Sequence, residues 1–195
     1  MRVVDPIGAW CQLASALNLD DLIAVGDGLL AGRLPLATSE GINARVLENV
    51  GLRGVRRLRE AALLIRPRVE SRRETFLRLF LMRCGFPEPD TNREIVLPPG
   101  TPRVRGDLVY PQYRVLVEYD GEQHRTDDAQ FNRDLERLQD LRDAGWIVIT
   151  VRKGSSPEWV RSHVDAALRF RAGAPKSALP RLFLSRLPTR SGGSR

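Results

Sequence analysis

The chain contains two segments in which polar and apolar residues alternate, 103–110 and 113–120, joined at Pro111-Gln112. Such alternation predicts β-strands, because successive side chains of a strand point to opposite faces of the sheet. With a turn at Pro111-Gln112 and Tyr110 paired with Tyr113, Asp107 is expected to lie opposite Leu116. The pattern therefore predicts a β-hairpin with an acidic face and a core face. The first carries Arg103, Arg105, Asp107, Leu116, Glu118 and Asp120, and the second carries Val104, Leu108, Tyr110, Tyr113, Val115, Val117 and Tyr119.

Three carboxylates, those of Asp107, Glu118 and Asp120, share the acidic face of this hairpin, and His124 follows shortly after it. Carboxylates that face one another across a sheet repel unless a cation lies between them. Oxygen ligands of this kind suit Mg²⁺ or Mn²⁺. The sequence thus predicts a divalent-metal site, and the alternative is a solvated strand edge that carries unrelated acids.

The remaining segments follow helical and extended patterns in turn. Apolar residues recur at helical spacing in 10–17, 22–30, 38–50 and 55–65, and Pro67 ends this helical region. Further helices are expected from Ser71 to about Gly85, from 127 to 144 and from 157 to 170, with strands at 92–97 and 146–151. The sequence predicts an α/β fold with a mixed sheet in the order α-β-β-β-α-β, preceded by a small helical region.

Composition narrows the class of protein. A content of 42% hydrophobic and 28% charged residues is typical of a globular protein. No apolar run reaches the roughly 18 to 20 residues that span a bilayer, and the start of the sequence lacks a signal-peptide pattern, so a cytoplasmic protein with no membrane contact is expected. Cys11 and Cys84 have no cysteine or histidine neighbours at ligand spacing, which argues against a disulfide framework and a zinc motif.

The net charge of +7 is spread unevenly along the chain. Residues 1–50 carry −3, residues 51–85 carry +7, residues 86–145 carry −5 and residues 146–195 carry +8. An acidic middle between basic arms is suited to hold a metal while the arms bind a phosphate backbone, so DNA is the expected partner. The alternative is that the arginine-rich helices are simply solvated.

Glu74 has two possible roles at the start of the helix after Ser71. It stands three residues after Ser71, the spacing of a capping box in which its carboxylate bonds back to the Ser71 amide. In the other role, the carboxylate turns toward Asp107. The direction of this side chain decides between the two.

Six fragments of the chain together resemble a nuclease family. They are S-R-R-E at 71–74, G-F-P-E-P at 85–89, R-G-D at 105–107, V-E-Y-D-G-E-Q-H-R at 117–125, F-N-R-D-L-E-R at 131–137 and A-G-W-I-V-I-T-V at 144–151. This pattern is similar to the Vsr-like endonuclease domains, a domain-of-unknown-function type within the PD-(D/E)XK nuclease superfamily. The helical region also resembles that of abortive-infection antitoxin-type proteins, without their winged helix, as in a truncated or degenerate version.

The resemblance implies a restriction-endonuclease-like core and three parts: helical residues 1–66, an endonuclease domain at 67–172 and a flexible basic tail at 173–195. It implies a Mg²⁺- or Mn²⁺-dependent DNA endonuclease acting in repair or defence. In that reading Asp107 and Glu118 bind the metal, Asp120 assists and Glu74 approaches through water. The further roles are a general base or phosphate ligand for His124, DNA phosphate contacts for Arg103, Arg105, Arg125 and Lys153, and support of His124 or the metal waters by Asp134 and Arg137.

One departure from the superfamily pattern keeps a second hypothesis open. The lysine that usually stands two positions after the glutamate is Asp120 here, and Lys153 is a candidate substitute. The alternative function is a catalytically silent DNA-binding or antitoxin-type regulator, with a toxin or a repair protein as a further partner. A third hypothesis, an interaction module with no nucleic-acid role, is favoured only by the helical start of the chain.

Overall fold

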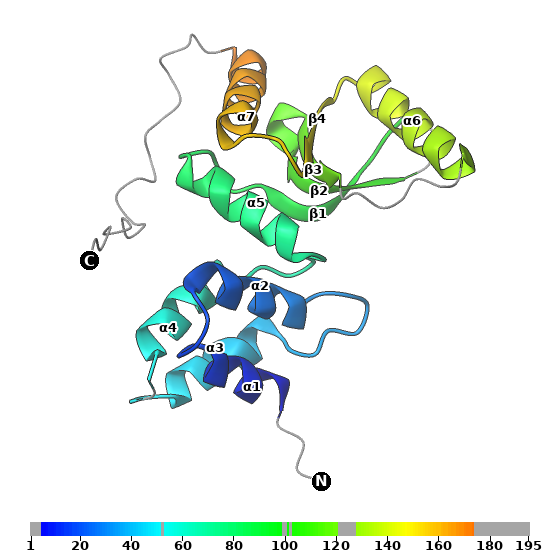
Figure 1. Cartoon of the computed structure of the whole chain (residues 1–195). Helices are drawn as coiled ribbons and strands as arrows, with labels where there is room; N and C mark the ends of the chain where they lie inside the picture. The colour runs from blue at the N-terminus through cyan, green and yellow to red at the C-terminus, as the bar shows by residue number, and fades with distance from the viewer. Residues whose placement is uncertain (1–4, 52, 99–100, 102, 121–127, 174–195) are drawn as a thin grey trace.

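A computed structural model describes residues 5–51, 53–98, 101, 103–120 and 128–173 of the chain. Within these ranges the protein is a mixed α/β structure of seven α-helices and one four-stranded sheet. Figure 1 shows a group of helices at one end, the sheet and the helices that cover it at the other, and α5 (Arg72–Arg83) between them. The predicted tail beyond residue 173 lies outside the described residues.

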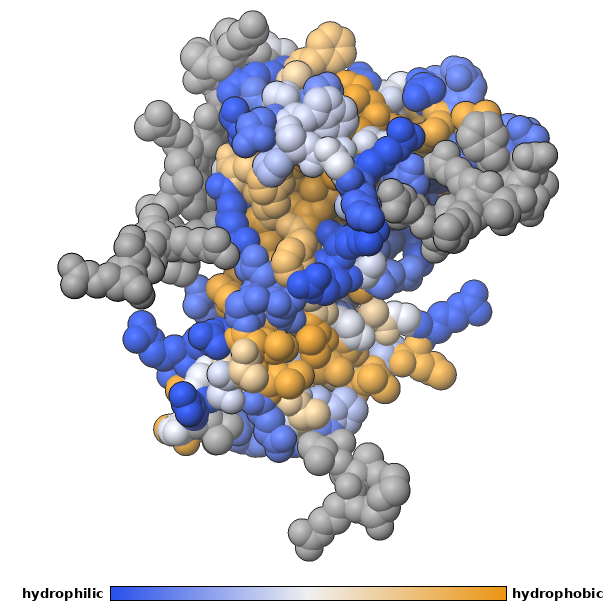
Figure 2. All heavy atoms as spheres, viewed as in Figure 1, coloured by the Kyte–Doolittle hydropathy of each residue, from blue (hydrophilic) through white to orange (hydrophobic). Residues whose placement is uncertain are grey.

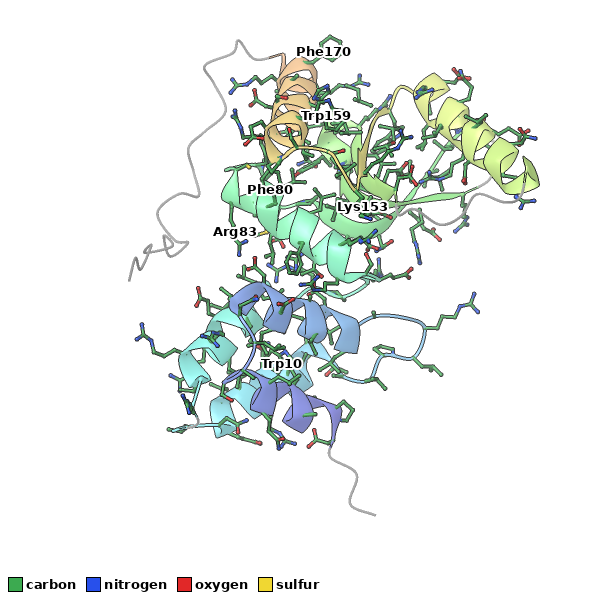
Figure 3. The ribbon with its side chains drawn as sticks, viewed as in Figure 1. Trp10, Phe80, Arg83, Lys153, Trp159 and Phe170 are labelled. Atoms are coloured by element: carbon green, nitrogen blue, oxygen red, sulfur yellow. The ribbon has the colours of Figure 1, made fainter. Side chains whose placement is uncertain are left out.

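The helical end consists of α1 (Pro6–Leu13), α2 (Leu19–Leu29), α3 (Ser39–Glu48) and α4 (Val55–Leu64). Asp5, Asn18 and Thr38 cap the first three helices by accepting a backbone N–H of the first turn. Gly54 enters α4 at a φ of 88°, where a Cβ would lie 2.6 Å from the Ala14 carbonyl oxygen. Figure 3 shows Trp10 among these helices, and its indole N–H donates to the Leu22 carbonyl at 2.8 Å.

The α/β end follows the predicted order α-β-β-β-α-β, and the helix predicted at 157–170 comes after it. Its elements are α5 (Arg72–Arg83), β1 (Asp90–Ile95), β2 (Val104–Tyr110), β3 (Val115–Asp120), α6 (Asp128–Asp143), β4 (Ile147–Arg152) and α7 (Pro157–Ala172). The sheet order is β1-β2-β3-β4, with antiparallel pairs at β1–β2 and β2–β3 and a parallel pair at β3–β4. The mixed sheet predicted from the sequence is therefore present, and β1 begins two residues earlier than expected.

Helices cover both faces of the sheet. The α5 and α7 face buries Leu77, Leu81, Leu108, Tyr110, Val115 and Val117, whereas the α6 face buries Ile95, Val104, Val109, Leu116 and Leu141. The prediction that one face is acidic and the other is core was wrong, because α6 turns the second face into a core as well. Leu116 is fully buried under it.

Val104 also lies on the α6 side and not with Leu108, since strict alternation is lost within β2. A Cβ on Gly106 would point at Leu116 and Val109, so positions 106 and 109 face the same side. This irregularity falls at Asp107 and Leu108, between those two positions.

The hairpin turn is longer than predicted. A 3-10 turn at Pro111–Tyr113 is followed by Arg114 in the left-handed region at φ 49°, and Tyr110 pairs with Val115 instead of Tyr113. The pairing runs from Tyr110 opposite Val115 to Leu108 opposite Val117, so Leu116 lies opposite Val109 and not opposite Asp107. The register differs by two residues, which preserves the side-chain alternation of β3.

The two ends of the molecule are joined through buried charges on α2 and α5. Asp27 and Arg78 form a 3.0 Å ion pair in which both side chains are almost fully enclosed. Arg78 also donates to the Leu64 carbonyl at 2.8 Å and to Glu88 at 3.1 Å. Leu79 of α5 belongs to the helical core, while Leu77 and Leu81 belong to the sheet core, so α5 is shared between them.

The surface reflects this division. Figure 2 shows a band of hydrophilic atoms between two apolar areas, one over the helical end and one over the sheet end. Within the described ranges, no helix combines the length and apolar character that crossing a bilayer requires.

Candidate metal centre

Asp107 lies at the irregular point of β2, and its side chain substitutes for a backbone group in the sheet. Its Oδ2 accepts the Tyr119 backbone N–H of β3 at 2.9 Å. The pKa of Asp107 is raised to about 6, mainly by burial and in addition by the negative charges of Glu74 and Glu118. The Tyr119 N–H and Arg137 oppose that rise. The negative charges of two other acids therefore act on the Asp107 carboxylate and disfavour its ionised form.

Glu74 occupies the first turn of α5 and is 8% exposed. The Ser71 hydroxyl caps this helix by accepting the Glu74 N–H at 3.2 Å. The Glu74 carboxylate does not return to the Ser71 amide: its Oε2 accepts the Glu70 N–H at 3.1 Å and the Asn92 side-chain N–H at 2.7 Å. Both bonds use the same oxygen, so Glu74 fixes the entry to α5 and still places its charge near Asp107.

Glu118 of β3 is bound by Arg137 of α6. Two N–H groups of Arg137 donate to the two carboxylate oxygens at 3.2 and 2.7 Å, and one of them also donates to the Arg105 carbonyl at 3.2 Å. This paired geometry is the strong form of an arginine–carboxylate contact. Arg137, which the sequence placed among supporting residues, thus ties α6 to β2 and β3.

Asp120 lies at the end of β3, directly beside Arg152 in the parallel pair with β4. Arg152 donates to its Oδ2 at 3.1 Å. The sequence offered no signal for Arg152, because its partner depends on the register of two strands separated by a helix. Asn92, which holds Glu74, was also missed, since it stands in an ordinary strand pattern and takes a left-handed φ of 43° only in the folded chain.

These groups surround a hollow of about 510 Å³ between α6 and the ends of β3 and β4. Its lining includes Asp107, Glu118, Asp120, Asp134, Arg137 and Arg152, together with Tyr119, Leu135, Leu138 and Thr150. The predicted residues Asp107, Glu118, Asp120, Asp134 and Arg137 thus meet in one place. Glu74 is not part of the lining and acts from the α5 side.

The other predicted residues lie elsewhere. Arg103 pairs with Glu94 at 3.1 Å on an exposed surface, and Arg105 pairs with Glu70. Lys153, labelled in Figure 3, follows β4 on the surface and does not line the hollow. His124 and Arg125 fall outside the described residues.

The donor set of the hollow suits a hard divalent cation. Mg²⁺ is commonly bound through one or two carboxylates with water completing the shell, and Asp107 and Glu118 both line this hollow. Among the residues with a described position, no group of three or more histidine, cysteine, aspartate or glutamate side chains is arranged to hold a metal ion. An ion held by Asp107 and Glu118 alone would need water for the rest of its ligands.

Together, these observations define a mixed α/β protein with an acidic hollow beside the ends of β3 and β4. No family model and no solved structure matches the chain. It is similar to two proteins of Mycobacterium tuberculosis, "Uncharacterized protein MT2308" of strain CDC 1551 / Oshkosh and "Uncharacterized protein Rv2248" of strain ATCC 25618 / H37Rv.

Each match is 30% identical over 145 residues, which is 73% of this chain and 52% of the relative. The chain therefore spans about half the length of the curated relatives that it matches. The names of these relatives state no activity.

Proposed function

We propose that the protein is a Mg²⁺- or Mn²⁺-dependent DNA endonuclease with a restriction-endonuclease-like core. The observation that supports this proposal most is the environment of Asp107. Its carboxylate is partly buried, and the negative charges of Glu74 and Glu118 both raise its pKa. A structural role alone does not explain why Glu74 and Glu118 both act on this partly buried carboxylate, because each of the two adds to the cost of ionising Asp107.

Asp107 and Glu118 would hold the ion, from β2 and β3 respectively. A divalent ion bound there supplies Lewis-acid stabilisation of charge on a phosphate and lowers the pKa of a bound water. Asp120 faces the same hollow, and Glu74 adds negative charge from α5 that favours a cation near Asp107. Arg137 and Arg152 supply positive charge on the rim, where the phosphate oxygens of a substrate need it.

The fold order supports the same proposal. A helix with an acid in its first turn, three antiparallel strands, a crossover helix and a parallel strand is the arrangement that the resemblance to PD-(D/E)XK nucleases implies. Defence or repair of DNA is the matching cellular role.

Cleavage of supercoiled DNA in Mg²⁺ or Mn²⁺ tests the proposal, with mismatched and single-stranded DNA as further substrates. Asp107→Asn and Glu118→Gln are expected to lower the cleavage rate by about 10²-fold or more, because each removes a charge that holds the ion. Glu136→Gln is the matched control, since Glu136 is an exposed acid of α6 that does not line the hollow. Cutting that survives Asp107→Asn, or no cutting of any substrate, rejects the endonuclease.

The second candidate is a catalytically silent DNA-binding or antitoxin-type regulator. It is favoured by the ion pairs of Glu118 with Arg137 and of Asp120 with Arg152, which neutralise two of the acids without any metal. Such a regulator would bind DNA in a salt-dependent way and keep that binding after Asp107→Asn and Glu118→Gln. Titration of Mn²⁺ into the wild type and Asp107→Asn separates the two candidates, since the silent protein takes up no ion at this site.

A further inference from the structure

A long groove follows the outer edge of β1, on the opposite side of β2 from the metal centre. It consists of two hollows of about 510 and 610 Å³ that share Arg68 and Arg93. β1 pairs only with β2 in the described sheet, and its other edge faces Pro67 and Arg68, whose carbonyls accept from Thr91 and Asn92. We call it the β1 groove, lined by 66–68, 88–91, 93 and 94, with Gly32, Arg33, Glu70, Asn92 and Arg105 at its wider end.

Each acid of the β1 groove forms an ion pair with at least one arginine. Glu88 binds Arg66 at 2.8 Å, Glu94 binds Arg103 at 3.1 Å, Asp90 binds Arg93 and Glu70 binds Arg105. Two arginines, Arg33 and Arg68, are then left over.

Both of these side chains are exposed, and no carboxylate of the described residues forms an ion pair with either of them. They come from different parts of the chain, Arg33 from the α2–α3 loop and Arg68 from the segment before α5. The groove therefore presents two guanidinium groups whose charge is not neutralised within it.

The backbone at Arg68 adds an independent observation. Arg68 and Asn92 both adopt left-handed conformations, at φ 65° and 43°, which arginine rarely does. The Asn92 side-chain N–H groups donate to the Arg68 carbonyl at 2.6 Å and to Glu74 Oε2 at 2.7 Å. The same asparagine thus holds the backbone of Arg68 and the carboxylate of Glu74, whose charge acts on Asp107. Strained residues of this kind persist where the surrounding structure holds them, and they cluster at functional sites.

We propose that the β1 groove binds the phosphate backbone of DNA, with Arg33 and Arg68 each contacting a phosphate. This inference rests on the proposed function, which makes DNA the ligand. A guanidinium group donates two parallel N–H bonds to phosphate oxygens, and two exposed arginines that line the same hollow suit successive phosphates of one strand. Asn92 then links the bound strand to Glu74 and so to the metal centre.

Salt-dependent DNA binding tests the groove without any need for cleavage. Fluorescence anisotropy with a labelled 20-base-pair duplex and with a single strand of the same sequence, in EDTA, gives Kd over a series of salt concentrations. The double variant Arg33→Gln/Arg68→Asn is used because asparagine tolerates the left-handed conformation at position 68. Its Kd is expected to rise about tenfold or more at 0.1 M salt, and the slope of log Kd against log salt is expected to fall by about two.

The matched control is Arg56→Gln/Arg59→Gln, which removes the same charge from two exposed arginines of α4 that do not line the groove. It is expected to leave the slope unchanged, and Arg33→Lys/Arg68→Lys is expected to restore it. An equal loss in both neutralised doubles, an unchanged Kd in Arg33→Gln/Arg68→Asn, or no binding of DNA by the wild type at low salt overturns the inference. Circular dichroism melting confirms that each variant is folded.

The failures of the two proposals are distinguishable. If cutting depends on Asp107 but Arg33→Gln/Arg68→Asn has an unchanged KM, the role of the β1 groove in DNA binding is rejected and the endonuclease proposal stands. If the wild type cuts no DNA but its DNA binding depends on Arg33 and Arg68, the endonuclease proposal is rejected and the role of the β1 groove in DNA binding stands.

Discussion

Asp27 is a fully buried carboxylate and Asp107 a partly buried one, and the groups around them differ in charge. Burial raises the pKa of both. Around Asp27, the Arg78 guanidinium, the Arg66 N–H at 2.7 Å and the Thr75 hydroxyl at 2.8 Å all oppose that rise.

Around Asp107, two further acids add to the rise, and one backbone N–H and a more distant arginine oppose it. The charge of Asp27, which has a structural role, is thus compensated by the groups around it. The Asp107 carboxylate is left with a deficit of positive charge, which a cation would supply.

Breaking the Asp27–Arg78 pair is expected to have the largest effect on stability. Arg78→Met leaves the carboxylate of Asp27 enclosed without its countercharge and should lower the free energy of unfolding by about 3–5 kcal/mol. Urea unfolding followed by circular dichroism measures the change. The double variant Asp27→Leu/Arg78→Met is the control and should recover part of the loss, because no unpaired charge remains. A loss below about 1 kcal/mol in Arg78→Met would contradict the structural role assigned to the pair.

Removing the charge of Asp107 is expected to stabilise the fold, whereas breaking the Asp27–Arg78 pair destabilises it. Asp107→Asn keeps an oxygen that accepts the Tyr119 N–H, and it should raise the free energy of unfolding in EDTA at pH 7 by about 1–2 kcal/mol, allowing for solvent screening of a partly exposed carboxylate. The pH dependence follows from the raised pKa. Because the folded protein holds the Asp107 proton more tightly than the unfolded chain, this group stabilises the fold fully below about pH 3.8, and that contribution is lost as the pH rises through about 6.

The difference between the wild type and Asp107→Asn should therefore be small at pH 4 and reach its full size near pH 7. Urea unfolding of both proteins at these two pH values measures it. A variant that is less stable than the wild type at pH 7 would show that Asp107 is compensated in the same way as Asp27.

A smaller effect is expected at Arg137, which neutralises Glu118 in the absence of a metal. Arg137→Gln should cost about 1 kcal/mol in EDTA, since the ion pair is partly exposed. Mn²⁺ should then stabilise the variant more than the wild type, because the ion no longer competes with the guanidinium group for Glu118. Thermal melting with increasing Mn²⁺ checks this, with Asp107→Asn as the variant that gains no stability from the ion. Equal stabilisation of Arg137→Gln and the wild type would separate Arg137 from the metal centre.

The smallest effect is expected for Arg103→Ala. Arg103 and its partner Glu94 are 83% and 62% exposed, so their ion pair should contribute less than about 0.5 kcal/mol. Thermal melting of Arg103→Ala should coincide with that of the wild type, which makes this variant a baseline for the other three. A marked loss of stability would mean that surface pairs along the β1 groove shape the fold.

Much of the fold follows from local signals in the sequence. Asn18, Thr38 and Ser71 start helices where the chain carries them, and the order of strands and helices matches the alternation of the two periods. The hairpin register was not predictable, because a 3-10 turn with a left-handed Arg114 is not signalled by Pro111-Gln112. The burial of Leu116 depends on α6 returning over the sheet, which is a tertiary contact.

The candidate site was predictable to the same extent. Acids at period-two spacing placed Asp107, Glu118 and Asp120 near one another, and they do line one hollow. Their arginine partners come from α6 and β4, and the asparagine that holds Glu74 comes from β1. These partners are remote in sequence, so spacing along one segment carries no information about them.

The sharing of α5 has a mechanical consequence. Arg78, locked to α2 through Asp27, and Glu74 lie one turn apart on the same stiff rod. A tilt of the helical end relative to the sheet would therefore move α5 and shift the Glu74 charge relative to Asp107. The position of the helical end is in this way coupled to the electrostatics of Asp107.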